Sequence, residues 1–159
     1  MNPLLIPVSV LAILLLAGCE ADVDPMNKQL TAKCLEKMLM QRQFDSWGEC
    51  FGTGYSYNGT TLARRAYEAT ADGLHLAFPN IAMQIVDQVE EGDKVVTQVR
   101  FSGIHTGRFS NMVNSGVEVE FTGVMIDRVS DGRIMDSRHS IDLWHVAQQL
   151  SSASNRGGQ

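Results

Sequence analysis

A single carboxylate near the end of the chain is the first candidate for acid–base chemistry. Asp142 closes the segment DGRIMDSRHSID, in which a turn at Asp131 and Gly132 is followed by a predicted strand. A carboxylate can take a proton from the carbon next to a carbonyl group when burial raises its pKa towards the working pH. The alternative is that Asp142 is a ligand-binding or structural polar residue at the end of the strand.

The residues beside Asp142 affect how well it could act as a base. Positions two apart share one face of a strand, so Arg138, Ser140 and Asp142 point the same way unless a bulge intervenes. An arginine on that face would stabilise the carboxylate as an ion and make it a poorer base, or would bind an anionic substrate group. His139 alternates to the opposite face, so we expect it outside the pocket.

Other side chains could donate a proton or bind a ligand. His105 shares strand parity with Phe101 and is therefore either a core histidine or a proton donor on the concave side of a sheet. Tyr57 lies in a predicted loop before a long helix and is a candidate hydrogen-bond donor, while Trp47 and Phe121 are candidate pocket walls or simply core. The histidines and cysteines lack metal-ligand spacing, so no metal is expected.

The start of the chain has the features of a secretory signal. Residues 1–18 carry no charged side chain, and their apolar run Val8–Leu16 is too short to span a bilayer. LAGC, residues 16–19, resembles the bacterial lipobox, after which Cys19 becomes the lipidated first residue. Glu20 favours the outer membrane over the inner one. We expect a signal peptide over 1–18 and a lipid-anchored protein in the bacterial cell envelope, the alternatives being a simple membrane anchor or a buried helix.

The rest of the chain is long enough for one domain. A polar segment with a proline predicts a tether over 19–27, the domain covers 28–150, and a disordered tail is expected over 151–159. The net charge of −5, without a basic cluster, argues against a nucleic-acid partner.

Two further cysteines lie near the start of this domain. Cys34 and Cys50 each stand about two helical turns from a predicted corner at residues 43–45, so a helical hairpin could bring them opposite one another. An exported protein meets an oxidising compartment in which such a pair can form a disulfide. Two separate buried thiols are the alternative.

Helical periodicity precedes strand periodicity, which predicts an α+β fold. The N-terminal helices should pack on a strongly curved antiparallel sheet, leaving a cavity for a small molecule between the two layers. Helices are expected within 27–51 and 61–78, a loop over 52–60, and a four-stranded meander over 81–89, 94–107, 117–130 and 133–146.

Five short stretches resemble, in order and spacing, the SnoaL-like polyketide cyclase or ester cyclase family. This resemblance implies a cystatin-like cone, also seen in nuclear transport factor two, and a ring closure by intramolecular aldol condensation without any cofactor. It further implies that Asp142 is the acid/base, although Arg138 stands where the family usually has an aromatic residue. The stretches are AFPN (77–80), EEGDKVV (90–96), GIHTGRF (103–109), IDRVSDGRI (126–134) and IDLWHVAQQL (141–150).

Two functions therefore compete. The first is a cofactor-free cyclase or isomerase for a small apolar carbonyl compound, with Asp142 as base and His105 or Tyr57 as donor. The second is a non-catalytic envelope lipoprotein that binds a hydrophobic ligand or docks to a partner, since polyketide precursors are made in the cytoplasm. The resemblance also implies a possible homodimer through the outer face of the sheet.

Overall fold

The computed structural model describes residues 26–109 and 114–154. The predicted signal peptide, the lipidation residue Cys19 and nearly all of the predicted tether lie outside these ranges. No helix within the described ranges is long and apolar enough to cross a membrane.

The centre of the fold is a six-stranded sheet with the order β2-β1-β6-β5-β4-β3. Its main part is the predicted antiparallel meander, in which each strand pairs with the next along the chain. Side chains in β5 alternate strictly between buried and exposed positions, so one face of the sheet forms the core. The four strands are β3 (Ala82–Glu91), β4 (Lys94–His105), β5 (Val117–Ser130) and β6 (Arg133–Ile141).

The predicted loop over residues 52–60 is wrong, because most of this segment belongs to two strands. Strand β1 (Phe51–Tyr57) pairs in parallel with β6, and the short β2 (Thr60–Thr61) pairs with β1. Phe51 and Tyr55 are buried, so the edge of β6 and the core together outweigh the turn-forming residues of this segment.

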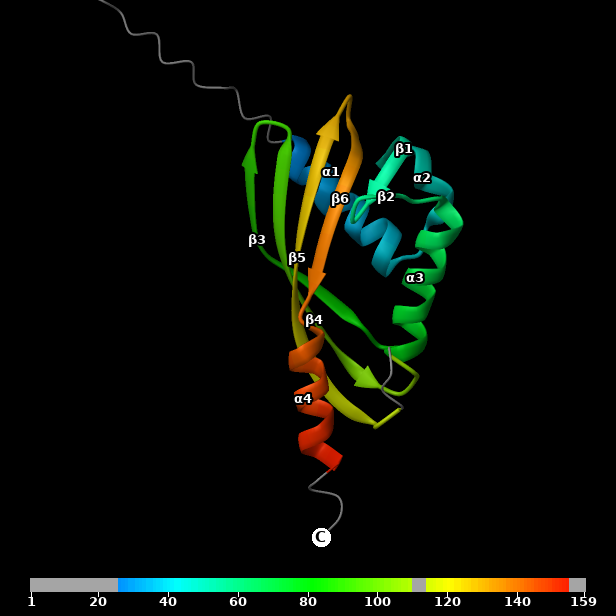
Figure 1. The fold of residues 1–159 in the computed structure, drawn as a ribbon, viewed down its shortest axis with the longest axis vertical. Helices are drawn as coiled ribbons and strands as arrows, with labels where there is room; N and C mark the ends of the chain where they lie inside the picture. The colour runs from blue at the N-terminus through cyan, green and yellow to red at the C-terminus, as the bar shows by residue number, and fades with distance from the viewer. Residues whose placement is uncertain (1–25, 110–113, 155–159) are drawn as a thin grey trace, which may run out of the picture.

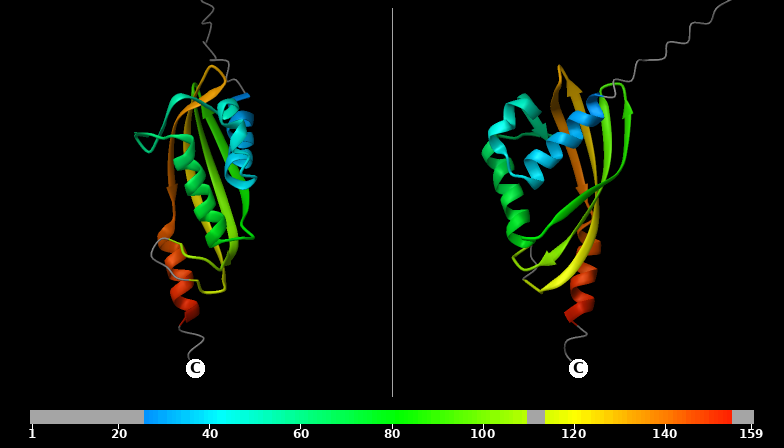
Figure 2. Two further views of the ribbon diagram at one scale, coloured as in Figure 1. Left: turned by 90° about the vertical axis from the view of Figure 1, so that its right-hand side faces the viewer. Right: turned by 180° about the vertical axis from the view of Figure 1, so that it is seen from behind.

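Helices α1 (Met26–Leu35) and α3 (Arg64–Ala77) lie on the same side of the sheet, as the two views in Figure 2 show. The first continues as a π-helical turn over Glu36–Met40. The C-terminal helix, α4 (Leu143–Ser154), extends beyond the end of the sheet along the long axis of the molecule (Figure 1). The predicted α+β class, with helices on a curved sheet, is thus confirmed.

The C-terminal elements end differently from the prediction. Strand β6 stops at Ile141 rather than continuing to residue 146, and α4 runs through Ser154, into the segment expected to be disordered. The helix is held by buried Val146 and by Gln149, whose side-chain amide exchanges two hydrogen bonds with the backbone of Glu120. This amide continues the backbone pairing of β5 where β6 has already ended.

A disulfide joins Cys34 in α1 to Cys50 at the end of α2 (Trp47–Cys50). The chain turns between them at Arg42, which has a φ of 55°, and a 3-10 turn over Phe44–Ser46 leads into α2. This is close to the predicted corner. Both cysteines are buried, and they pack with the aromatic cluster formed by Trp47, Phe51, Tyr55 and Tyr67.

Replacing both cysteines, Cys34→Ser with Cys50→Ser, should lower the free energy of unfolding by about 3 kcal/mol, because the bond removes loop-closure entropy from the unfolded chain. Urea unfolding with and without a reductant measures this. The wild-type midpoint should fall in the reductant and the double variant should not respond. An equal midpoint for wild type in both buffers would mean that the two thiols do not form a stabilising bond.

Candidate functional site

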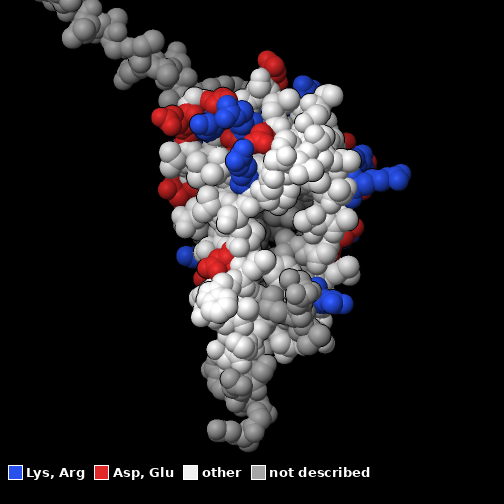
Figure 3. Space-filling model, in the orientation of Figure 1, with Lys and Arg blue, Asp and Glu red and all other residues white. Residues whose placement is uncertain are grey.

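The described part of the fold contains a cavity of about 380 Å³ between α3 and the concave face of the sheet. In Figure 3 the surface is hollowed between the sheet and α3, and charged side chains gather mainly away from this hollow. Most of the lining is apolar, which is typical of small-molecule sites. The lining residues are Leu39, Tyr57, Ala69, Thr70, Gly73, Leu74, Phe101, Arg108, Phe109, Phe121, Met125, His139, Ile141 and Leu143.

A bulge in β6 decides which of its side chains face this cavity. Val129 pairs with Ile134 and Arg128 pairs with Asp136, so Met135 is an extra residue without a partner in β5. One extra residue reverses the alternation beyond it. Inward positions therefore change from Ile134 before the bulge to Ser137, His139 and Ile141 after it.

Asp142 consequently lies on the outer side of the fold. It shares a face with Arg138 and Ser140, as predicted, but all three are exposed and none lines the cavity. Asp142 instead borders a shallow depression that includes Val124 and Trp144. The expectation that Asp142 and Arg138 face the concave side is wrong, because the bulge turns that face outward. Arg138 pairs at 3.6 Å with Asp136.

In the structure Asp142 serves as the N-cap of α4. Its Oδ1 accepts a hydrogen bond from the backbone N–H of His145 at 3.0 Å, and its backbone N–H donates to Thr122. A carboxylate at this position satisfies an N–H that has no partner within the helix. The side chain selected from the sequence as a base is thus a helix-start signal.

Asp142→Ala should lower the free energy of unfolding by about 1 kcal/mol through loss of the cap, whereas Asp142→Asn should change it by only a few tenths, because asparagine caps about equally well. Thermal or urea unfolding of the two variants against wild type checks this. A cost for the asparagine variant as large as that for alanine would contradict the capping role.

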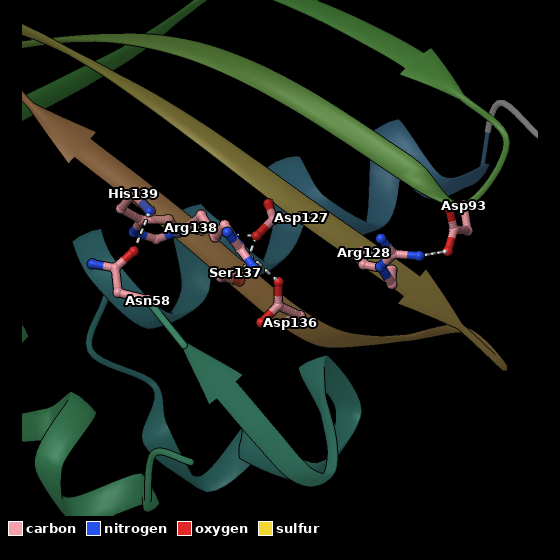
Figure 4. Close-up of polar contacts among 8 residues, drawn as sticks. All are labelled: Asn58, Asp93, Asp127, Arg128, Asp136, Ser137, Arg138 and His139. Atoms are coloured by element: carbon pink, nitrogen blue, oxygen red, sulfur yellow. Dashed lines mark hydrogen bonds and ion pairs between the residues drawn. The ribbon is translucent and has the colours of Figure 1, made fainter. Parts of the chain in front are cut away.

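Behind the cavity wall lies a buried polar cluster around Asp127, which is 2% exposed on the inner face of β5. The Ser137 hydroxyl donates a hydrogen bond to its Oδ1 at 2.5 Å, and the same oxygen is 3.9 Å from Nε2 of His139. Figure 4 shows Ser137 and His139 on β6 beside Asp127 on β5. The second carboxylate oxygen, Oδ2, has no hydrogen-bond partner among the described residues. A buried carboxylate with one free oxygen is costly and therefore requires a reason.

His139 connects this cluster to the cavity. It lines the 380 Å³ cavity and also a much smaller space of about 10 Å³ that Asp127, Ser137 and Tyr55 border. Its ring packs edge-on against Tyr57 with centroids 4.9 Å apart, and its backbone N–H donates to Asn58 at 2.9 Å. Nε2 is the ring nitrogen that faces Asp127, at an ion-pair distance rather than a hydrogen-bond distance. The expectation that His139 lies outside the pocket is wrong for the same reason as for Asp142.

Three tyrosines surround the cluster. Burial raises the pKa of Tyr57, and it raises the pKa of Tyr55 and Tyr67 well above their usual value of 10. All three phenols therefore keep their protons in the neutral range and can act as hydrogen-bond donors. The Tyr55 hydroxyl is buried and has no partner among the described residues, so it is a second unsatisfied polar atom on the border of the smaller space.

His105 lies on the concave side, as its parity predicts, but it does not line the cavity. It is fully buried against Phe78, with its Nδ1 3.1 Å from the Ser115 hydroxyl. Burial lowers its pKa below the usual 6.5, and a hydrogen bond with the Gly107 backbone opposes this in part. The position fits the core interpretation better than the proton-donor interpretation.

The lowered pKa of His105 predicts a pH-dependent stability. The unfolded chain binds this proton more readily than the folded one, so the free energy of unfolding should fall as the pH drops below about 6.5. A His105→Asn variant, which can keep a bond to Ser115, should lose less stability than wild type between pH 7.5 and 5.5. Urea unfolding at both values checks this, with His145→Gln on the exposed face of α4 as control. Equal losses in wild type and His105→Asn would contradict it.

The remaining predicted ligand contacts divide equally. Tyr57 and Phe121 line the cavity, whereas Trp47 packs within the aromatic cluster and Arg138 is exposed. No group of three potential metal ligands occurs among the described residues.

Comparison with known families agrees with this fold. The SnoaL-like polyketide cyclase family matches residues 29–150. The chain belongs to this family. A search of curated proteins found no match.

Several solved structures share the SnoaL-like fold with this chain. A candidate SnoaL-like polyketide cyclase from Jannaschia sp. CCS1 has 22% identity and a TM-score of 0.71, over 82% of this chain and 95% of the other. IdmH from Streptomyces antibioticus, a candidate polyketide cyclase, has 21% identity and a TM-score of 0.68, over 78% and 97%. A SnoaL-like polyketide cyclase from Agrobacterium tumefaciens has 15% identity and a TM-score of 0.69, over 79% and 97%. At these identities the likeness concerns the fold.

The sequence reasoning missed Asp127, Ser137, His139 and Arg108. Asp127 could have been found, because it shares parity with Phe121 and Met125 on the buried face of β5, where a carboxylate is unusual. Ser137 and His139 depend on the bulge at Met135, for which the sequence carries no plain signal.

Proposed function

We propose that this SnoaL-like domain catalyses cofactor-free proton transfer on a small, mostly apolar carbonyl compound, as in enolisation that leads to ring closure or isomerisation. The observation that carries the proposal is the position of His139, in the wall of an apolar cavity with the buried carboxylate of Asp127 behind it. A histidine with a carboxylate beside it is a recurrent general-base arrangement.

In this proposal His139 is the catalytic residue. Its neutral ring takes the proton from the carbon next to the substrate carbonyl, and the electron pair moves to the carbonyl oxygen as an enolate. In a ring closure the enolate carbon then attacks a second carbonyl carbon of the same molecule, forming a carbon–carbon bond. The resulting alkoxide receives a proton from the imidazolium, which restores the neutral ring.

Asp127 is a positioning residue in this scheme. Its carboxylate lies 3.9 Å from Nε2, where its negative charge would stabilise the imidazolium formed in the first step. It is buried behind the histidine and does not line the larger cavity, so it would not contact the substrate there. Ser137 holds the carboxylate in place from the same strand that carries His139.

Tyr57 is the best-placed donor for the enolate oxygen. It lines the same cavity, contacts the His139 ring, and keeps its proton because burial raises its pKa. A neutral phenol can donate a hydrogen bond to a developing oxyanion, and the surrounding apolar side chains strengthen such a bond by excluding water.

The proposal is tested by incubating the protein with a panel of enolisable ketones and keto esters in D2O and following deuterium uptake at the carbon next to the carbonyl. This readout detects proton abstraction without knowledge of the final product. His139→Gln should slow the exchange by about 10²- to 10⁴-fold, the usual contribution of a general base. Asp127→Asn should lower kcat with little change in KM, because it leaves the cavity wall intact.

His145→Gln is the matched control, since this histidine is exposed on α4 and does not line the cavity. Exchange that survives His139→Gln would remove the assigned base. Ligands that raise the melting temperature without any exchange would favour the alternative, a binding protein without chemistry.

A further inference from the structure

The cavity wall carries one permanently charged side chain among its described residues, Arg108. No Asp, Glu or Lys accompanies it there, and the only other ionisable groups are His139 and Tyr57. The rest of the lining is mainly aliphatic and aromatic. The cavity therefore combines a large apolar volume with a single cation.

Arg108 has no acidic partner among the described residues. Most other arginines do, since each of a group of five forms an ion pair with a carboxylate. An unpaired guanidinium beside an apolar cavity can supply its charge and its fork of N–H donors to a ligand instead. The five paired residues are Arg42, Arg64, Arg100, Arg128 and Arg138.

The backbone on both sides of Arg108 is fixed. The N–H groups of Thr106 and Gly107 donate to the carbonyl of Ala77 at the end of α3, at 2.9 and 3.1 Å. A side chain at Gly107 would collide with the carbonyl of Leu76, so glycine is required for this close approach. On the other side, the Phe109 ring packs against the rings of Phe78 and Phe121. The neighbours of Arg108 therefore fix its backbone beside the cavity, while its side chain is exposed.

We propose that the natural ligand is a compact amphipathic carboxylate, whose anionic group pairs with Arg108 and whose apolar body fills the cavity. This deepens the proposed function, on which it rests for the identity of the site. A volume of about 380 Å³ is near the lower end of the range of about 300–1,000 Å³ for small-molecule pockets, so it favours one ring or a short chain over a large fused ring system. A carboxylate gains a charge-assisted bidentate contact, a neutral ligand gains none, and a cationic ligand is repelled.

The test uses three probes with the same chain and different head groups: octanoate, 1-octanol and octylamine. Calorimetric titration of the full chain at neutral pH should show octanoate binding about 10-fold or more tightly than 1-octanol, with octylamine weakest, as expected for a hydrogen bond between charged groups. Arg108→Gln should remove the preference for octanoate and leave the affinity for 1-octanol unchanged. Raising the salt concentration should weaken only octanoate.

Arg65→Gln is the matched control, because it removes the same charge from an exposed position on α3 that does not line the cavity. It should retain the octanoate preference. Urea unfolding should show that Arg108→Gln folds as wild type does, since its side chain is exposed. Equal affinity of wild type for octanoate and 1-octanol, an unaltered preference in Arg108→Gln, or no binding of any probe would overturn the inference.

The two proposals fail separately. Octanoate preference that depends on Arg108, together with no deuterium exchange in any ketone, would uphold the anionic ligand and remove the catalytic role. Exchange that depends on His139, without a preference for carboxylates, would uphold the catalytic role and remove the anionic ligand.

Discussion

The extra residue in β6 is the constraint on which the site depends. Side chains on a strand alternate between two faces, so a single unpaired residue, Met135, exchanges the inner and outer sets beyond it. The Met135 side chain packs against Gly52 in β1. Any side chain at position 52 would collide with the Met135 sulfur. Through this bulge His139 enters the cavity wall, while Asp142 leaves the sheet on the outer side and caps α4.

The helical layer that covers the cavity is anchored at two places. The disulfide and the aromatic cluster fix one end of the helical layer, and the hydrogen bonds to Ala77 fix the other. Between them the walls are supplied by separate packed groups, so the sheet and α3 can remain apart. In the proposed function, this frame would position a ligand on rigid elements.

The buried polar cluster at Asp127 lowers the stability of the fold. A carboxylate that is 2% exposed has one hydrogen-bond donor, and both its second oxygen and the Tyr55 hydroxyl have no partner among the described residues. A core built for stability alone would place apolar side chains there. The acid–base role proposed for the neighbouring His139 would account for that cost, because the apolar walls around it would strengthen its interactions with charges that develop in the proposed reaction.

The sequence by itself determined the class of fold, the four-stranded meander, the corner between the cysteines and the buried faces of β4 and β5, because alternation, helical period and turn residues are local signals. The sequence also contains the local signals for the buried position of Asp127 in β5 and for Asp142 as the N-cap of a helix. Only the tertiary structure decided that β1 joins the edge of β6, that Met135 bulges, and that His139, Tyr57 and Arg108 meet at one cavity. These features arise from pairing between segments far apart in the chain, where a shift of one residue moves every following side chain to the other face.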